Sequence, residues 1–208
     1  ISALVDVTNY ITIDLGRPLH VFDAGKLADD NLTMRTAHTG EEMLALDGKT
    51  YELDPSMTVI ADTSGVHGIG GIMGGEKTGC TESTTEMFLE VALFDPVKIA
   101  TTGRKLNLQS DARYRFERGI DPASAEWGAH AAARLIAEFC GGEASHLVRS
   151  GTMPTLRPVM SLRHDRVCKL GGADIPPARQ QEILETLGFA VQTNGTCFQV
   201  TPPTWRPD

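Results

Sequence analysis

The first 94 residues alternate between hydrophobic and polar positions or gather apolar residues into short runs, a pattern that predicts strands joined by turns. An Asp-Gly pair at residues 47–48 predicts a tight hairpin turn between two short strands. Longer apolar runs have the length and composition of buried strands. The segments predicted as strands on these grounds are residues 2–8, 32–37, 57–61, 66–73 and 88–93.

Helical signals dominate after residue 94. Asp95 and Pro96 place a capping carboxylate ahead of a proline at the first helical position, which predicts a helix to about residue 106. Asp121 and Pro122 repeat this arrangement. The alanine-rich stretch at residues 123–140 then predicts the longest helix, which a Gly-Gly pair ends.

Residues 153–158 contain two prolines and no periodicity, which predicts a linker between domains at 1–152 and 159–208. Beyond the linker, residues 163–170 and 177–187 are predicted helices, followed by a small hairpin. About 50 residues is little for an independent core. The strands expected before residue 94 and the helices expected after it together predict a mixed α/β (α+β) fold class. A curved, mainly β-sheet core would be covered by helices and followed by a partial small helical module.

The composition excludes several classes of protein. The chain has 208 residues, 41% of them hydrophobic and 22% charged, so it can form a core. Its net charge of -8 restricts nucleic-acid binding to local basic patches or to binding with help from other domains. Four widely spaced cysteines without a CxxC pair argue against zinc and suit a reducing compartment, and no apolar run is long enough for a membrane span. The chain starts without methionine and ends abruptly, so we expect a piece of a longer protein.

Glu90 is the most unusual polar residue, because it lies inside the apolar run at residues 87–94. A carboxylate in a buried strand needs a partner, or its pKa shifts. Two interpretations remain open from the pattern alone. Glu90 could be a structural ion-pair partner of Arg113 or Arg115, or it could accept a hydrogen bond from a ligand hydroxyl.

Other polar and glycine-rich segments also allow two interpretations. The glycines of residues 68–76 match no phosphate-binding loop and no helix is expected after them, so they indicate a tight bulged strand or a wall close to a ligand. His20 follows Pro18 in a predicted loop, where a solvated or structural histidine is the plain interpretation. The basic run at 113–118 could contact phosphate, although paired surface charges explain it more simply. No serine or cysteine has a recognisable nucleophile setting.

Five motifs together resemble the beta subunit of bacterial phenylalanine–tRNA ligase. In order they are VDVTNY, GRPLHVFD, GGIMGGE, LEVALFDP and SDARYRFERGIDP. The resemblance covers the whole chain. It implies that residues 1–152 are the editing module, and that 159–208, from SLRHDRVCKLGG through LETLGF to TPPTWRPD, begin a module similar to a DNA-binding fold.

The resemblance implies hydrolysis of tyrosine wrongly attached to phenylalanine tRNA, with activated water as the nucleophile. Glu90 would receive the tyrosine hydroxyl, and His20 would lie near the ester bond. Thr8 and Asn9 would lie at the polar end of the amino acid. Many family members carry threonine at the position of Ser110. The residues that would shape the pocket are Gly74, Ser110 and Ala112.

The resemblance also implies cofactors and partners. Asp208 would be the first ligand of a magnesium site whose other ligands lie beyond residue 208, so no cofactor is expected here, whereas the complete enzyme uses Mg²⁺ and ATP. The alpha subunit, in an α2β2 heterotetramer, and tRNA(Phe) would be the partners, and tyrosine the editing ligand. The location would be cytoplasmic. The alternative is a non-catalytic scaffold that binds tRNA or supports assembly; the TPPTWRPD tail argues against a free-standing editing protein.

Overall fold

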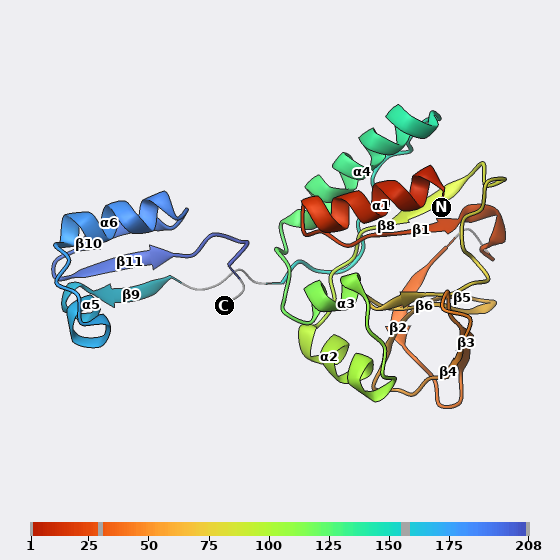
Figure 1. The fold of residues 1–208 in the computed structure, drawn as a ribbon, viewed down its shortest axis with the longest axis horizontal. Coiled ribbons are helices and arrows are strands. Elements are labelled where there is room, and N and C mark those ends of the chain that lie inside the picture. The colour runs from red at the N-terminus through yellow and green to blue at the C-terminus, as the bar shows by residue number, and fades with distance from the viewer. Residues whose placement is uncertain (1, 29–30, 155–158, 207–208) are drawn as a thin grey trace. The chain divides into compact units, whose positions relative to one another are not determined.

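The computed structural model describes residues 2–28, 31–154 and 159–206, and the chain divides into two units, Ile1–Arg149 and Ser150–Asp208. Figure 1 shows the path of the chain through both units. Most of the expected linker, 155–158, lies outside the described residues. No helix in the described part of the chain is long and apolar enough to cross a membrane.

The first unit combines small antiparallel sheets with helices. A four-stranded sheet has the order β2-β5-β6-β7, and two further pairs are β3 with β4 and β1 with β8. The strands are β1 His20–Asp23, β2 Thr33–Thr36, β3 Glu42–Leu44, β4 Thr50–Glu52, β5 Thr58–Asp62, β6 Gly65–Ile69, β7 Met73–Gly74 and β8 Met87–Glu90. The helices are α1 Ala3–Asp14, η1 Ala24–Lys26, α2 Pro96–Lys105, α3 Asp111–Phe116 and α4 Ser124–Cys140.

Two apolar clusters hold this unit together. The larger one joins the four-stranded sheet to α2 and α3, with Val59 and Ile69 from the sheet packed together with Ile99 and Phe116 from the helices. The smaller cluster joins α1 to α4 through Val7, Ile11 and Ala132, and Leu89 of β8 packs against it. The β1–β8 pair is therefore covered on one face by α1 and α4 (Figure 1).

Several local predictions are confirmed. The Asp-Gly pair forms the β3–β4 turn, with Gly48 at φ 77°. Asp95 caps α2 by accepting hydrogen bonds from the N–H groups of Val97 and Lys98. Helix α4 ends at Gly141, whose φ of 76° suits glycine. The mixed α/β class with covering helices is confirmed as well.

Other predictions are wrong in instructive ways. Residues 2–8 open helix α1 instead of a strand; Ser2 caps it, and buried Val7 and Ile11 follow the helical spacing. The predicted strand at 66–73 is two strands, β6 and β7, because the chain turns at residues 70–72. His20 lies in strand β1 rather than in a loop. Helix α3 was not predicted, since six residues give too short a periodic pattern.

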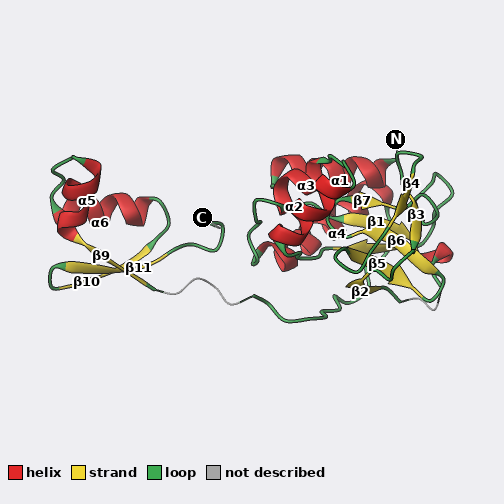
Figure 2. Cartoon of the chain, turned by 90° about the horizontal axis from the view of Figure 1, so that it is seen from below, coloured by secondary structure: helices red, strands yellow, loops and turns green. Residues whose placement is uncertain are grey.

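The second unit is a small three-stranded antiparallel sheet with two helices (Figure 2). The two helices and the hairpin agree with prediction, and strand β9 extends the hairpin to the order β10-β11-β9. Phe198 and Val200 are its buried apolar side chains within the described residues. The elements are β9 Met160–Arg163, α5 His164–Gly171, α6 Pro177–Thr186, β10 Ala190–Asn194 and β11 Cys197–Thr201.

Candidate functional site

The pairing of β1 with β8 brings two predicted site residues together. His20 lies directly opposite Glu90 in the antiparallel register. Residues opposite each other in such a pair project from the same face of the sheet, with Cβ atoms about 5 Å apart. On the other face, Leu89 packs against the cluster formed by α1 and α4, and Val21, opposite Leu89 in the register, is buried. One face of this pair therefore holds helices, and the other presents an imidazole and a carboxyl group.

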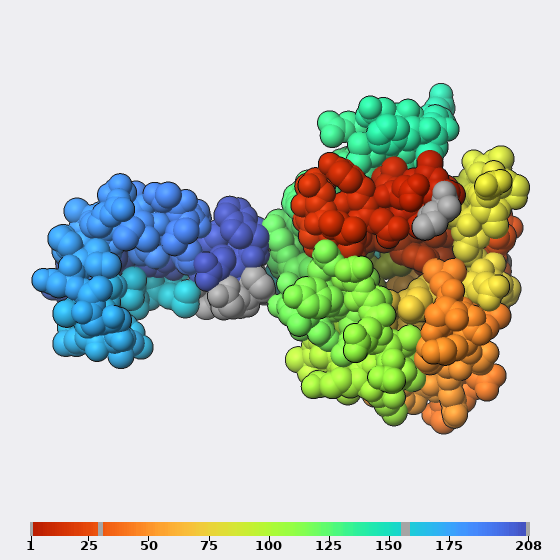
Figure 3. All heavy atoms as spheres, in the orientation of Figure 1, coloured from red at the N-terminus to blue at the C-terminus, as the bar shows by residue number. Residues whose placement is uncertain are grey.

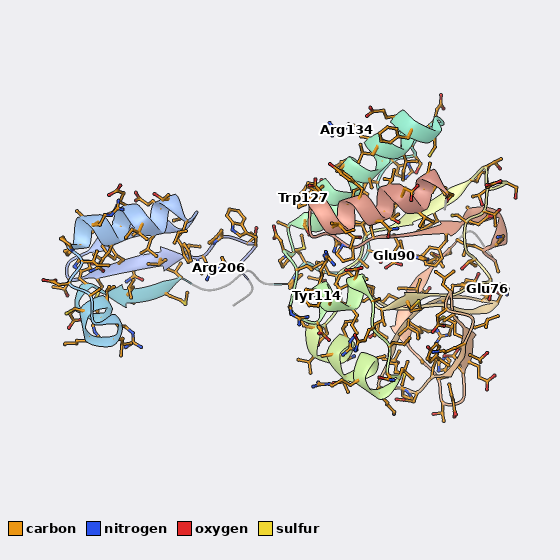
Figure 4. The ribbon with its side chains drawn as sticks, viewed as in Figure 1. Glu76, Glu90, Tyr114, Trp127, Arg134 and Arg206 are labelled. Carbon is orange, nitrogen blue, oxygen red and sulfur yellow. The ribbon has the colours of Figure 1, made fainter. Side chains whose placement is uncertain are left out.

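Glu90 lies at a recess in the first unit. The space-filling view shows a hollow where α1 meets the segments around α3 and β3–β4 (Figure 3). Figure 4, in the same orientation, labels Glu90 at that place, and its side chain is partly exposed. A ligand could therefore reach the carboxyl group from solvent.

Gly74 of β7 forms the wall next to His20. A Cβ atom at Gly74 would lie 2.5 Å from His20 Cε1 and 2.9 Å from Nε2, which is too close for any other residue without displacing the ring. The His20 ring also packs edge-on against Phe22, with centroids 4.5 Å apart. The imidazole is thus held on two sides, and glycine at residue 74 is required by its position.

The protonation states of the two groups follow from their surroundings. Burial lowers the pKa of His20 to about 4, so the imidazole is neutral at physiological pH. Its Nε2 atom has no hydrogen-bond partner among the described residues. Burial raises the pKa of Glu90 to about 7, while the charge of Arg17 opposes that rise. Glu90 therefore titrates near physiological pH, where a small change in its surroundings alters its charge.

Neither predicted ion-pair partner of Glu90 is its partner in the structure. Arg113 binds Glu117 at 3.0 Å, and Arg115 binds Asp111 at 3.0 Å. Within the described residues, no basic nitrogen lies within 4.0 Å of the Glu90 carboxylate. The structural ion-pair interpretation is wrong for these arginines, and the carboxylate stays available as an acceptor. These pairs also favour paired surface charges over a phosphate patch.

Arg17 is a charged residue near the site that sequence reasoning did not single out. Its side chain is fully buried, and Nη2 donates to the carbonyl oxygen of Ala92 at 2.5 Å. Its Cζ atom lies 5.8 Å from the centre of the Phe116 ring. Burial lowers its pKa to about 10, opposed by Glu90 and Asp121, so it remains a cation. An arginine before a proline carries no sequence signal of burial.

Ser110 and Ala112 belong to the first turn of α3, close to the glycine wall. Ser110 caps the helix by accepting from the N–H of Arg113 at 3.0 Å, and its hydroxyl donates to the carbonyl oxygen of Ile72 at 2.6 Å. Ala112 packs against the larger apolar cluster. Ser110 thus fixes the start of α3 to the turn that precedes Gly74, a role its sequence did not indicate.

Thr8 and Asn9 lie on helix α1. Thr8 is buried, and its hydroxyl donates to the carbonyl oxygen of Val5 at 2.8 Å within the same helix. Asn9 is exposed. The interactions of the described residues do not connect either side chain to His20 or Glu90. Their assignment to the site stays a prediction.

The glycine-rich segment has a structural explanation at two of its positions. Cβ atoms at Gly70 and Gly71 would lie 2.6 and 2.8 Å from the Phe94 ring. Gly71 also has a φ of 69°, which favours glycine. No helix follows this segment, because the next element is strand β8, so the phosphate-loop interpretation has no support. Gly70 and Gly71 lie in the turn between β6 and β7 rather than in a bulged strand, since the register shift is between Ile60 and Ala61 of β5. Among the glycines of this segment, Gly74 is the one whose added Cβ would meet His20.

A second buried polar pair, Asp62 and His67, was not predicted. His67 Nε2 lies 2.8 Å from Asp62 Oδ1, and both side chains are almost fully buried. Burial acts to raise the pKa of Asp62, but hydrogen bonds from the N–H groups of Ala28 and Ser64, together with the close contact of His67, outweigh it and hold the pKa well below its usual range. These bonds tie β5 and β6 to residue 28, which indicates a structural pair.

The described residues form no candidate metal centre. Across residues 2–28, 31–154 and 159–206, no three histidine, cysteine, aspartate or glutamate side chains are grouped so as to hold a metal ion. Asp208, the expected first magnesium ligand, lies outside the described residues. The magnesium assignment stays a prediction.

The family models match both units. The B3/4 domain model matches residues 1–141, and the tRNA synthetase B5 domain model matches residues 160–208. The chain therefore belongs to the B3/4 domain family and continues into a B5 domain.

The curated relatives are more specific. The chain is 51% identical over 208 residues to the phenylalanine–tRNA ligase beta subunit of Paramagnetospirillum magneticum, and 52% identical over 209 residues to that of Rhodospirillum rubrum. Each match covers 100% of this chain and 26% of the relative, so the chain spans about a quarter of their length. The resemblance found in the five motifs is thus confirmed.

One solved structure is a distant neighbour. An N-terminal fragment of the phenylalanyl-tRNA synthetase beta subunit from Pyrococcus horikoshii has a TM-score of 0.42 and 15% identity, with 99% of this chain and 60% of that chain covered. This likeness is too weak to carry an argument.

Proposed function

We propose that this chain carries the proofreading site of a phenylalanine–tRNA ligase, where tyrosine wrongly joined to tRNA(Phe) is released by hydrolysis. The observation that carries the proposal is the placement of Glu90. It is a partly buried carboxyl group without an ion-pair partner within 4.0 Å among the described residues, and it lies opposite the neutral imidazole of His20.

The selection follows from the chemistry of one hydroxyl group. A pocket shaped for phenylalanine rejects tyrosine only weakly, because an added hydroxyl is tolerated to within about 100-fold. A site that accepts a hydrogen bond from that hydroxyl sorts in the opposite sense. When phenylalanine enters, the Glu90 carboxylate remains desolvated and unpaired, which can reduce binding by a factor of about 10⁴.

The bond-breaking step would use water. A histidine with a pKa of about 4 is a weak general base at neutral pH, so we assign His20 to orienting water or the ester by hydrogen bonding. Its Nε2 atom is buried beside Gly74 and has no hydrogen-bond partner among the described residues, so this contact requires the ligand or water to reach a buried atom. Thr8 and Asn9 would hold the polar end of the amino acid. Gly74, Ser110 and Ala112 would shape the pocket.

The remaining roles belong to the longer protein. Attachment of phenylalanine with ATP and Mg²⁺ would take place outside this chain, in a cytoplasmic α2β2 enzyme with the alpha subunit. Asp208 would contribute to a magnesium site with later residues. Because the net charge is -8, we expect weak tRNA affinity for residues 1–208 alone.

The test is Glu90→Ala in the complete enzyme. We expect release of tyrosine from tyrosyl-tRNA(Phe) to slow by about 100-fold or more, while phenylalanine charging stays unchanged. Glu86→Ala is the matched control, because Glu86 is exposed just before β8. Unchanged tyrosine release by the Glu90 variant would refute the proposal.

A scaffold that binds tRNA or supports assembly is the second candidate. The observation that favours it is that the hydroxyl groups of Thr8 and Ser110 already make hydrogen bonds within the fold. A crystal soaked in tyrosine separates the two candidates. Density for the phenol against Glu90 supports proofreading, whereas an empty site at saturating tyrosine supports the scaffold.

A further inference from the structure

We propose that Arg17 is a positioning residue for Glu90: a buried cation that holds the segment after β8 through the carbonyl oxygen of Ala92 and favours the ionised form of the Glu90 carboxyl group as the acceptor for the ligand hydroxyl. The inference rests on the proposed proofreading function and adds a residue that sets its range of working pH.

The first support is the position of Arg17 at the ends of both site strands. It precedes His20 by three residues in the chain. Its Nη2 atom donates to the carbonyl oxygen of Ala92, two residues beyond Glu90. One side chain therefore joins the segment entering β1 to the segment leaving β8. Movement of either strand relative to the other would strain this hydrogen bond.

The second support is that the side chain has no freedom to turn away. Its aliphatic part runs over Gly128 of α4, where a Cβ atom would lie 2.9 Å from Arg17 Cγ. Its guanidinium lies near the Phe116 ring, at 5.8 Å from the centroid. Helices α3 and α4 thus enclose Arg17, and glycine at residue 128 makes room for it.

The third support is that Arg17 has buried hydrogen-bond donors without partners, which packing alone does not explain. Nε and Nη1 of Arg17 are buried and have no hydrogen-bond partner among the described residues. A buried charge with unpaired donors destabilises a fold, and an apolar side chain of similar length would fill the same space at lower cost. Attraction to Glu90, and next to Asp121, offsets part of that cost.

Within the described residues, Arg17 is the cation whose charge acts on Glu90. His20, opposite on β1, is neutral at physiological pH because burial lowers its pKa to about 4. Arg113 on α3 is bound to Glu117. The charge of Asp121, which precedes α4, raises the pKa of Arg17. The charge of Arg17 opposes the effect of burial on Glu90, so its removal should raise the pKa of Glu90 above about 7.

The experiment measures tyrosyl-tRNA(Phe) deacylation by the complete enzyme between pH 6 and 8.5, with spontaneous hydrolysis subtracted. In Arg17→Met we expect the midpoint of the rate profile to rise by about one pH unit, with release about tenfold slower at pH 6 and close to normal at pH 8.5. Arg17→Lys should restore the normal midpoint. Arg35→Met is the control, since Arg35 is paired with Glu41 elsewhere in the unit.

Arg17→Gln is a second neutral variant, which keeps the test valid if Arg17→Met does not fold. Glutamine keeps an N–H donor for the carbonyl oxygen of Ala92 but carries no charge, so the same upward shift is expected. Phenylalanine charging reports on intact assembly. An unchanged midpoint in both neutral variants, or an equal loss of rate at every pH, would overturn the inference, because either result means that Arg17 acts only through packing.

The Glu90→Gln background separates this inference from the proposed function. If Arg17 acts through Glu90, Arg17→Met should have no further effect on the pH profile in that background. A Glu90→Gln enzyme that releases tyrosine normally shows that a neutral acceptor is sufficient, which refutes the role of Arg17. A Glu90→Ala enzyme that releases tyrosine normally refutes proofreading by Glu90 itself. A Glu90→Gln enzyme that loses release, combined with an unshifted Arg17→Met profile, refutes only the role of Arg17.

Discussion

The β1–β8 pair and the four-stranded sheet of the same unit are built for different tasks. The four-stranded sheet buries Val59 and Ile69 almost completely in the larger apolar cluster. The β1–β8 pair packs one face on α1 and α4 and turns His20 and Glu90 to the other face. Stability is therefore concentrated in one sheet and candidate chemistry in the other, and Gly74 of β7 is the point where they touch.

A cavity in the four-stranded sheet should produce the largest loss of stability. Ile69 is 2% exposed, and Ile69→Ala should lower the free energy of unfolding by about 2–5 kcal/mol. Denaturant unfolding of the chain measures the effect. Ile13→Ala is the matched control, because Ile13 is 68% exposed on α1 and should change stability little. A loss below about 1 kcal/mol for Ile69→Ala would contradict the assignment of stability to this sheet.

Replacing Gly74, where the four-stranded sheet touches the β1–β8 pair, by alanine should affect the site more than the fold. Gly74→Ala must displace the His20 ring, since the added Cβ would lie 2.5 Å from Cε1. Misplacement by about 1 Å can slow a reaction by about 100-fold, so we expect tyrosine release to fall by that order. Deacylation by the complete enzyme measures it. Gly68→Ala is the control, because Gly68 pairs with Gly74 but has no atom closer than 3.8 Å to its added Cβ; equal losses in both variants would contradict the role of His20.

The smallest expected effect is a pH-dependent gain in stability on neutralising Glu90. Its pKa is about 7 in the folded chain, against an ordinary value of 4.5. The folded chain thus binds more protons than the unfolded chain between these values, and its stability falls as pH rises through that window. The difference between these two pKa values corresponds to about 3 kcal/mol, which solvent screening of the partly exposed side chain reduces to about 1 kcal/mol. Glu90→Gln removes this loss, so it should be more stable than the parent by about 1 kcal/mol above pH 7 and similar to it below pH 4.5.

Thermal unfolding of both proteins across this pH range measures the difference. His20 titrates in both proteins, so its contribution cancels. A gain that is the same at every pH would mean that packing, rather than the charge of Glu90, is responsible.

Local chemistry made part of the fold predictable. The Asp95 cap, the Gly141 end of α4 and the Asp-Gly turn depend on residues close together in sequence, and all three are confirmed. Residues 2–8 were misassigned because alternation and helical spacing are hard to distinguish over seven positions. Strand β9 gave no clear signal, since it is short and largely exposed.

The candidate site depends on contacts that local patterns do not record. His20 and Glu90 are 70 residues apart in sequence, and only the β1–β8 register places them opposite each other. Glu90 stood out because it is a charge within an apolar run, whereas His20 and Gly74 were suggested by the motif resemblance. The burial of Arg17 was not predicted, because it arises from the packing of α3 and α4 around the side chain.

The fit of Phe94 against Gly70 and Gly71 has a consequence for how this protein can change over generations. The ring occupies the space that side chains at residues 70 and 71 would need. A larger residue at 70 is tolerable only after Phe94 has become smaller, whereas Gly71 is also fixed by its φ of 69° and by its contacts with Ile99 and Phe116. Sequence drift at residues 70 and 94 must therefore proceed by paired substitutions, while residue 71 stays glycine.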